Sequence, residues 1–539
     1  MSGVNKHINT SLFSATCLLL FFFACIPAKK MKPDLSKTEF IYIQNGEFKH
    51  HRERFFPVML NYVVGFRELN GKVVMSPIKE YEDPETFENN NSDSTSHQLQ
   101  GHLRLIKEMG FNTIRLAMDR VQQDKGRYYY PSDNKWIYVD KDCRKLIAAI
   151  HDFLKLAEKE KLRVMLLIKP PYDNESLNLF TKDILKSFRN EPVLFAYDFF
   201  NEPLYFDTKT DDKGNAVLRP KEEVVSIVND WRMMVDNYAP SQMLTIGFSE
   251  PIEVFEWDPS ILPVDFVAFH TYNPLRVINE IYWYSNYSQK PWMIGETALP
   301  ADGDSISYDE QTLYYREVLQ SVLKCGGIGI GWWEFQEIPN THFEAQYTGI
   351  LNHKGETITK SGGYHIKGTV KPMVKEVLSS SYAKQERICP CMKNYENMLG
   401  YENYLIKGLI LDDETSKPIE GAVIRGWNAD WSIGQNTFSR KDGSFNLFSN
   451  DKCIHFEMSA PGYSNSKFDA NFTYKWLAIK NKLKKLANTK IEYHSISYKD
   501  FLVNKKQSVL KFKSGKFNRY KTWSQMKPVL LKKLQTTGF

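Results

Sequence analysis

Cysteine is scarce in this chain, and its distribution argues against two common uses. Only 7 of the 539 residues are cysteine, and two of them lie in an apolar N-terminal run. An odd number remains, which argues against a disulfide framework: Cys143, Cys325, Cys389, Cys391 and Cys453. The pair in Cys389-Pro390-Cys391 has neither a second cysteine pair nor histidines at zinc-binding spacing, so no metal site is expected.

The first 470 residues carry no excess of basic charge. The whole chain has a net charge of +6, but residues 471–539 carry 17 Lys and Arg against 2 Asp and Glu, a net +15 that leaves −9 for the remainder. Nucleic-acid binding is therefore not expected of the larger part. The basic stretch has two interpretations: a solvated face, or a contact for anionic lipid headgroups or acidic envelope polysaccharide.

The apolar run near the N-terminus is short. It covers residues 12–25, LFSATCLLLFFFAC, after Lys6 and His7, and its length and flanks favour a secretory signal over a membrane span. Its end resembles a bacterial lipoprotein signal, with residues 1–25 as the signal peptide and Cys25 as the lipidated residue, although Phe22 stands where Leu is usual. The resemblance implies a lipoprotein of the cell envelope, in the periplasm or on the outer membrane. Cleavage without lipidation and an uncleaved anchor are the alternatives.

Strand-like and helix-like runs alternate between residues 55 and 378. Near-continuous apolar strands between amphipathic helices are typical of a parallel sheet covered on both sides. The expected strands are 56–63, 113–118, 163–168, 193–200, 243–248, 265–272, 291–297 and 327–335, and the expected helices are 98–109, 143–161, 221–238, 308–323 and 364–378. No Gly-rich phosphate loop follows the first strand, which disfavours an open doubly wound sheet. The pattern predicts an α/β fold, a (β/α)8 TIM barrel over residues 38–380.

Polar side chains gather where the expected strands end. The strand AYDFF stops in Asn201, Glu202 and Pro203, although a charge at the rim of a core is costly unless it is paired or used. The other ends carry Arg115, His270 with Tyr272, Glu296 and Trp333. Each alone has a structural explanation, such as a salt bridge or packing. Because barrel active sites lie at the C-terminal ends of the strands, their joint placement predicts an active site there.

These motifs resemble the clan A retaining glycoside hydrolases, and within them family 5, which includes cellulases and β-mannanases. FFNEP and IGET match the two glutamate motifs, and GFNTIRLAM, FHTY and GWWEF match the Arg, His-x-Tyr and Trp elements, over about residues 40–378. A short hairpin is also expected before the first strand. In place of the histidine that commonly follows strand 3, this chain has Lys169 and Tyr172, which leaves the subfamily and the sugar open.

The resemblance implies a role for each of the residues at the strand ends. Glu202 would be the acid/base and Glu296 the nucleophile, about 5 Å apart in a retaining mechanism. Binding of the sugar falls to Arg115, Asn201, His270, Tyr272 and Trp333. Neither a metal nor an organic cofactor is implied, and a monomer acting on a β-glucan or β-mannan, endo or exo, is expected. Two other classes stay open: a non-catalytic glycan-binding envelope protein, and an interaction protein that works through its C-terminal module.

The C-terminal part has the pattern of a small all-β sandwich. After a polar linker at 381–402, residues 403–539 resemble a carboxypeptidase regulatory-like domain through Gly408, KPIEGA at 417–422, DGSF at 442–445 and PGY at 461–463. Alternating apolar residues from Phe445 to Leu447 support half-buried strands, and residues 527–534 are expected to form the last strand after a basic insertion. Such modules are usually spacers or docking elements.

The anchor is testable by substitution. We expect Cys25→Ser to move the protein from the membrane to the soluble fraction, because lipid chains would supply most of its membrane affinity. Fractionation and immunoblotting of expressing cells measure this, with Cys17→Ser as the control that leaves the distribution unchanged. Unchanged membrane association of the Cys25 variant would contradict the lipoprotein assignment.

Overall fold

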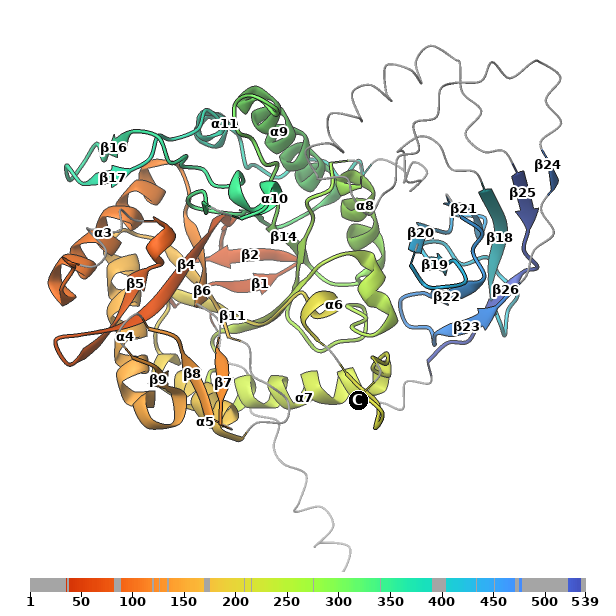
Figure 1. The fold of residues 1–539 in the computed structure, drawn as a ribbon, viewed down its shortest axis with the longest axis horizontal. Helices are drawn as coiled ribbons and strands as arrows, with labels where there is room; N and C mark the ends of the chain where they lie inside the picture. The colour runs from red at the N-terminus through yellow and green to blue at the C-terminus, as the bar shows by residue number, and fades with distance from the viewer. Residues whose placement is uncertain are drawn as a thin grey trace, which may run out of the picture. The chain divides into compact units, whose positions relative to one another are not determined.

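Eight parallel strands close into a barrel in this computed structural model (Figure 1). It describes residues 35, 38–81, 89–118, 121–125, 127–132, 135–168, 175–207, 209–214, 216–274, 276–339, 341–389, 404–432, 434–449, 451–470, 475–476 and 522–534. In barrel order the strands are β4 (Val58–Leu69), β6 (Thr113–Met118), β10 (Arg163–Leu167), β11 (Leu194–Asn201), β12 (Met243–Phe248), β13 (Val267–His270), β14 (Trp292–Glu296) and β15 (Ile330–Trp332). Pairing of β15 with β4 closes the ring, and the predicted TIM barrel is confirmed.

The helices that cover the barrel agree with the predicted ones in four of five cases. They are α3 (Ser92–Glu108), α4 (Val139–Lys159), α5 (Glu175–Phe188), α7 (Lys221–Tyr238), α8 (Val277–Tyr287), α9 (Tyr308–Cys325) and α11 (Met373–Ser379). The expected helix at 364–378 is wrong in its first half, where β17 (His365–Lys367) pairs with β16 (Glu356–Ile358). Gly368, at φ +111°, and Pro372 separate this hairpin from α11, because the glycine conformation is not helical and proline lacks the N–H that a helix interior needs.

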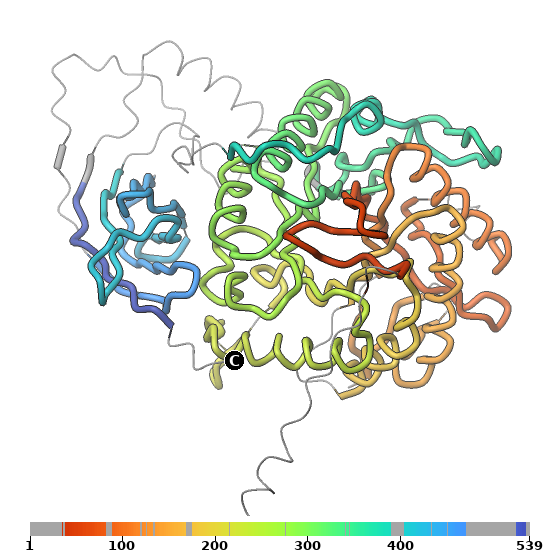
Figure 2. Tube along the Cα trace, turned by 180° about the vertical axis from the view of Figure 1, so that it is seen from behind, coloured from red at the N-terminus to blue at the C-terminus, as the bar shows by residue number. Residues whose placement is uncertain are grey.

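The N-terminal hairpin expected before the first strand is present, and it closes one end of the barrel (Figure 2). It is formed by β1 (Tyr42–Gln44) and β2 (Glu47–His50), with β3 (Glu53–Arg54) beside β2, and it lies across the barrel in Figure 2. Phe48 is fully buried and meets the rings of Phe195 and Phe266 edge to face, at 5.8 and 5.0 Å between centroids. Both partners lie at the beginnings of strands, so the hairpin covers the N-terminal end of the barrel. Only the C-terminal ends of the strands are left for a site.

One disulfide bond corrects the interpretation of the cysteines. Cys325, at the end of α9, is bonded to Cys389, 64 residues further on, whereas Cys143 and Cys453 are free. An odd number of cysteines excludes complete pairing but not a single bond between distant residues. Its loop is of a length at which cross-linking typically adds about 2–4 kcal/mol of stability. The bond holds the segment after α11 against α9.

Two sheets face each other in the C-terminal region. The first contains β18 (Tyr404–Asp412), β21 (Ser444–Ser449), β24 (Lys475–Trp476), β25 (Thr522–Gln525) and β26 (Val529–Leu531), and the second contains β19 (Val423–Trp427), β20 (Gly434–Phe438), β22 (His455–Ser459) and β23 (Ser466–Asp469). Buried residues of both sheets share one core, including Ile406, Ile424, Phe445, Leu447 and Phe456. The all-β sandwich is therefore confirmed, with β26 as the predicted last strand.

Several predictions concern residues outside the described ranges. These are the signal peptide with Cys25, the positions Lys169 and Tyr172, the linker beyond Cys389, and most of the basic C-terminal stretch. The boundaries at 38–380, 381–402 and 403–539 stay predictions. Among the described residues, no helix has both the length and the apolar character needed to cross a membrane.

Buried polar contacts join the barrel to the sandwich. Lys221, at the first position of α7, is bonded to Asp258 at 2.9 Å, and both side chains are almost completely buried. The ammonium also donates to the carbonyl oxygens of Ala460 and Tyr463 in the sandwich, at 3.2 and 2.8 Å. Burial lowers the pKa of Lys221 while Asp258 opposes the shift. The charges of Lys221 and Asp258 are therefore satisfied within the contacts between the barrel and the sandwich.

This junction predicts a large effect on stability. Lys221→Met leaves the buried Asp258 carboxylate without its cation, and we expect the free energy of unfolding to fall by roughly 3–5 kcal/mol. Lys72→Met is the matched control, because its ion pair with Asp152 is exposed and is worth about 1 kcal/mol or less. Urea unfolding monitored by circular dichroism measures both variants. Equal losses in the two variants would contradict the inferred role of the junction.

Candidate active site

The end of β11 departs from a regular strand. The register of β11 against β12 shifts between Asp198 and Asn201, and Glu202 then adopts a left-handed conformation, with φ +50° and ψ +70°. Its backbone N–H donates to the carbonyl of Gly247 at 2.6 Å. A non-glycine residue in this region costs of order 1–3 kcal/mol and is retained where the surroundings impose it. In a regular strand, two adjacent side chains would point to opposite faces of the sheet. The irregularity allows both Asn201 and Glu202 to lie at the same end of the barrel.

Arg115 of β6 forms the centre of the polar network. Its side chain is fully buried. Its Nε donates to Asp198 Oδ2 at 2.8 Å, and one terminal nitrogen donates to Asn201 Oδ1 at 2.8 Å. The other donates to Asn61 Oδ1 at 3.1 Å and to Glu296 Oε1. A buried guanidinium needs such partners, and here its charge is balanced by two carboxylates.

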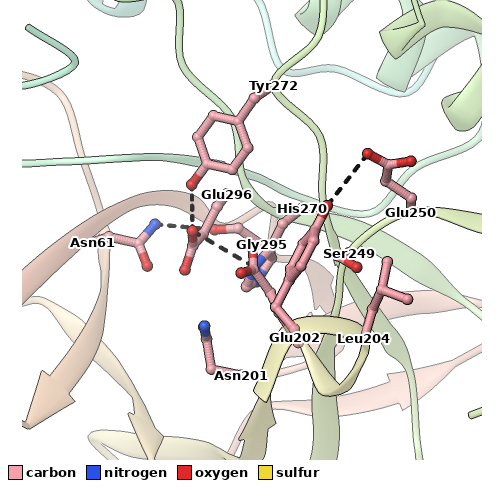
Figure 3. A network of polar contacts seen from close by, with 12 residues as sticks. Asn61, Asn201, Glu202, Leu204, Ser249, Glu250, His270, Tyr272, Gly295 and Glu296 are labelled. Atoms are coloured by element: carbon pink, nitrogen blue, oxygen red, sulfur yellow. Dashed lines mark hydrogen bonds and ion pairs between the residues drawn. The ribbon is translucent and has the colours of Figure 1, made fainter. Parts of the chain in front are cut away.

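Glu296, the last residue of β14, is bound through both of its oxygens. Arg115 donates to Oε1. The hydroxyl of Tyr272 donates to Oε2, as Figure 3 shows. Burial and the neighbouring Glu296 raise the pKa of Tyr272, which keeps this phenol protonated as a donor. An oxygen of Glu202 and an oxygen of Glu296 lie within 4.8 Å of each other. The two carboxyl groups therefore lie close together. Glu296 accepts from two donors, whereas Glu202 has 15% of its side chain exposed.

His270, the last residue of β13, lies between the two carboxyl groups. Its Nδ1 is 2.8 Å from Glu202 Oε1 and 3.5 Å from Glu296 Oε2 (Figure 3). Burial lowers its pKa to about 4, so the ring is neutral near pH 7. Nε2 is buried without a hydrogen-bond partner among the described residues. The single ring proton is therefore better placed on Nδ1, where an oxygen of a carboxyl group accepts it.

Two glycines make room for His270. A Cβ at Gly247 would lie 2.9 Å from the imidazole and 3.1 Å from the Arg115 guanidinium. A Cβ at Gly295 would lie 3.0 Å from the same imidazole. The backbones of β12 and β14 thus approach the ring directly from both sides. Glycine at these two positions sets the depth at which the histidine sits.

Two contributors to the network escaped the sequence interpretation. Asp198 pairs with Arg115 and also accepts from the Gly247 N–H at 2.9 Å. Asn61 of β4 accepts from Arg115 and donates to the carbonyls of Gly295 and Trp332, both at 3.0 Å. Each lies inside an apolar strand, one in AYDFF and the other in MLNYV. A single buried polar residue within such a run was the available signal.

Two further buried carboxyl groups were also missed. Burial, reinforced by Glu202, raises the pKa of Glu253 to about 8, and its Oε1 accepts from the N–H groups of Leu204 and Ser249 at 3.1 and 3.0 Å. These bonds support the turn that follows Glu202. Burial likewise raises the pKa of Glu334 to about 8, and the Tyr81 hydroxyl donates to it. Near pH 7 both groups hold a proton in a substantial fraction of molecules.

The three groups Glu202, His270 and Glu296 could in geometry hold a cation. The electrostatics oppose this, because the Arg115 cation already binds one oxygen of Glu296 and a phenol donates to the other. A metal ion would have to displace these donors and approach a buried positive charge. These donors are better suited to positioning a reactive carboxylate than to forming a metal site.

Most of the predicted site residues come together. Arg115, Asn201, Glu202, His270, Tyr272 and Glu296 share one hydrogen-bonded network. Trp333 follows β15, is partly buried against the barrel core, and its backbone N–H donates to the carbonyl oxygen of Thr297 at 3.0 Å. Its role as a sugar platform stays a prediction.

Comparison with known proteins gives structural likeness only. No family model and no curated protein matches the chain. Similar solved structures include an exo-β-1,4-mannosidase from Opitutaceae bacterium strain TAV5, with 14% identity, a TM-score of 0.43 and coverage of 62% of each chain. A β-D-glucuronidase from Dictyoglomus thermophilum has 12% identity and a TM-score of 0.38, over 63% of this chain and 52% of that one. An endo-1,4-β-mannanase from Eisenia fetida has 16% identity and a TM-score of 0.36, over 55% and 90%. The chain thus spans less than two thirds of the first two proteins.

The glycine beside His270 gives a test of the site's packing. Gly247→Ala places a methyl group against the imidazole and the guanidinium, and we expect a loss of about 1–3 kcal/mol in the free energy of unfolding. Gly65→Ala in β4 is the matched control, because its added Cβ meets nothing within 4 Å. Denaturant unfolding of both variants measures the difference. A Gly247 variant as stable as the Gly65 variant would show that the ring is not held tightly between the strands.

Proposed function

We propose that this protein is a retaining β-glycoside hydrolase that acts on a β-linked polysaccharide or oligosaccharide of the glucan or mannan type. The observation that carries the proposal is the separation of Glu202 and Glu296, whose oxygens approach within 4.8 Å. Retaining enzymes hold their carboxyl groups about 5 Å apart, whereas inverting enzymes leave about 6.5–9.5 Å for a water molecule. The distance supports a double displacement through a covalent intermediate.

Glu296 is the nucleophile. It must be ionised to attack, and its two oxygens accept from the Arg115 guanidinium and the Tyr272 hydroxyl. The same two donors fix the carboxylate before the substrate arrives, so little reorganisation accompanies the attack. Its position as the last residue of β14 places it at the barrel end that is not closed by the N-terminal hairpin.

Glu202 is the acid/base. It is the more exposed of the pair, with 15% of its side chain accessible against 5% for Glu296, which suits a group that exchanges protons with a leaving group and with water. An oxygen of Glu202 lies within 4.8 Å of an oxygen of Glu296, and two carboxyl groups this close do not readily ionise together. His270 contacts one of its oxygens and orients it.

The reaction has two steps that use these groups in turn. In the first, a Glu296 oxygen bonds to the anomeric carbon as the bond to the leaving oxygen breaks, and Glu202 gives its proton to that oxygen. In the second, Glu202, now a carboxylate, removes a proton from water while the water oxygen replaces Glu296 at the anomeric carbon. The product keeps the β configuration, and both glutamates return to their starting states.

Substrate binding is assigned to the groups around the pair. Asn201, oriented by its bond from Arg115, is placed to bind the hydroxyl next to the anomeric carbon, where hydrogen bonds strengthen in the transition state. Trp333 offers an apolar face for a pyranose ring. A purely glycan-binding barrel would need neither carboxyl group at this distance, so the presence of both favours catalysis.

The two glutamates can be distinguished by azide. On a β-glycoside with a good leaving group, Glu202→Ala should still form the glycosyl-enzyme and then stall, because no base activates water. Azide needs no such base, so it should accelerate turnover and give the β-glycosyl azide. Glu296→Ala leaves space beneath the anomeric carbon, and azide should attack there directly to give the α-glycosyl azide. Product configuration is measured by proton NMR.

A panel of aryl β-glucosides, β-mannosides and β-xylosides provides the substrates, and Glu222→Ala, on the exposed side of α7, is the control that retains activity. A β-azide from the Glu296 variant would reverse the assignment. Absence of any released sugar with the unmodified protein, on this panel and on the corresponding polysaccharides, would favour a glycan-binding barrel.

A further inference from the structure

The outer face of the second sandwich sheet carries an aromatic surface that the proposed chemistry does not use. Along β19, Ile424 points into the sandwich core, so the alternating residues Val423, Arg425 and Trp427 lie on the opposite face. Val423 packs in the barrel core cluster instead. The face therefore begins buried against the barrel and continues outward through Arg425 to Trp427.

Trp431 lies at the far end of this face and is held there. It is stacked on His455 of β22, with ring centroids 4.1 Å apart and planes at 6°, and its ring is 5.3 Å from that of Trp427. Its φ of +63° is unfavourable for tryptophan. Even so, 48% of the residue is exposed. An exposed indole in a strained turn is a feature that packing alone does not require.

His455 is fixed as the support for this indole. Its Nδ1 is 2.8 Å from Asp469 Oδ1, and its Nε2 is 3.3 Å from the carbonyl oxygen of Ala429. Both ring nitrogens therefore face acceptors, and the bond to Asp469 raises the pKa of His455. A ring in which both nitrogens donate is an imidazolium, which stacks favourably on the indole face.

One hydrogen bond and longer-range electrostatic interactions connect this surface with the segment that follows the acid/base. Tyr205, three residues after Glu202, is 55% exposed, and its hydroxyl donates to Glu250 at 3.4 Å. Glu250 and Tyr205 both lie within electrostatic reach of Arg425. The Arg425 guanidinium in turn lies over the Trp427 ring, 4.4 Å from its centroid.

The strands beneath the surface are anchored near the same rim. β19 and β22 both lie against the 3-10 helix η3 (Pro251–Phe255), which begins three residues after the last residue of β12. Trp283 of α8 donates from its indole nitrogen to the carbonyl of Gly421 at 2.8 Å. These contacts hold the sheet against η3, which follows β12, and against α8, so the position of the sheet relative to Glu202 is set by the fold.

From this arrangement we infer that the face formed by Tyr205, Arg425, Trp427 and Trp431 binds the leaving-group half of a β-linked polysaccharide chain. The inference rests on the proposed function, because the acid/base Glu202 marks the side on which the leaving group lies. Indole faces bind the C–H faces of pyranose rings, while Arg425 and Glu250 are suited to sugar hydroxyls. The sandwich thus extends the binding site of the barrel.

The charge of the surface favours a neutral chain as its occupant. Lys467 is paired with Glu457 at 3.0 Å and His455 with Asp469 at 2.8 Å. Arg425 faces Glu457 and Glu250. Because each cation has a carboxylate near it, an anionic polymer would gain little net attraction, and stacking would dominate the binding.

The binding test uses the full chain with Glu296→Ala, so that the polymer stays intact. Its migration is measured in native gels that contain soluble glucomannan, galactomannan or mixed-linkage β-glucan. Adding Trp431→Ala or Trp427→Ala should raise the Kd for the retained polymer about tenfold, the loss expected of one stacking contact. Leu530→Ala is the matched control, since this residue is 47% exposed on the other sheet; its Kd should stay unchanged. Trp431→Tyr keeps a ring and should retain most of the binding.

Kinetics on the otherwise unmodified protein give an independent readout. The Trp431 and Trp427 variants should lose about tenfold in kcat/KM on the polymer while an aryl β-glycoside, too short to reach the sandwich, is hydrolysed at the original rate. Unchanged polymer affinity in both variants, or a parent protein that no polymer retards, would overturn the inference. If the polymer retards the protein in a tryptophan-dependent way but the protein hydrolyses no substrate, the proposed function is refuted while the polysaccharide-binding surface is supported.

Discussion

The buried Arg115 guanidinium is the constraint on which the site depends. It is fully inaccessible and bonds to side chains from β4, β11 and β14. An unpaired charge at this depth would cost several kcal/mol, so the strand ends must hold their relative positions for the fold to be stable. The nucleophile is therefore positioned by the same contacts that neutralise a core charge. Loss of any one partner disturbs both stability and geometry.

Much of the barrel could be predicted from the sequence because its signals are local. Each strand is a short apolar run, and the polar residues Glu202, His270 and Glu296 interrupt the pattern at its end, whereas Arg115 lies inside β6. The false helix at 364–378 shows the limit of this approach. Apolar spacing there fits a helix, but Gly368 at φ +111° and Pro372 divide the segment, and the first part pairs as a hairpin.

Features that arise from tertiary contact could not be predicted. Asp198 and Asn61 are single polar residues in apolar runs, and only closure of the barrel shows that both face Arg115. The left-handed conformation of Glu202 depends on its bond to Gly247 in the next strand. The bond between Cys325 and Cys389 spans 64 residues with no local signal. In each case the partner lies on another element, and the sequence around one residue carries no information about it.

The attachment of the sandwich follows the same physical rule as the site. Lys221 and Asp258 form a buried pair that also bonds to the sandwich backbone at Ala460, Gly462 and Tyr463. A swinging module would leave these buried groups unsatisfied, at a cost that increases with each lost bond. The sheet that bears Trp427 and Trp431 is therefore fixed relative to Glu202. A fixed aromatic surface orders a long chain at little entropic cost, whereas one on a flexible linker would have to be immobilised each time it binds.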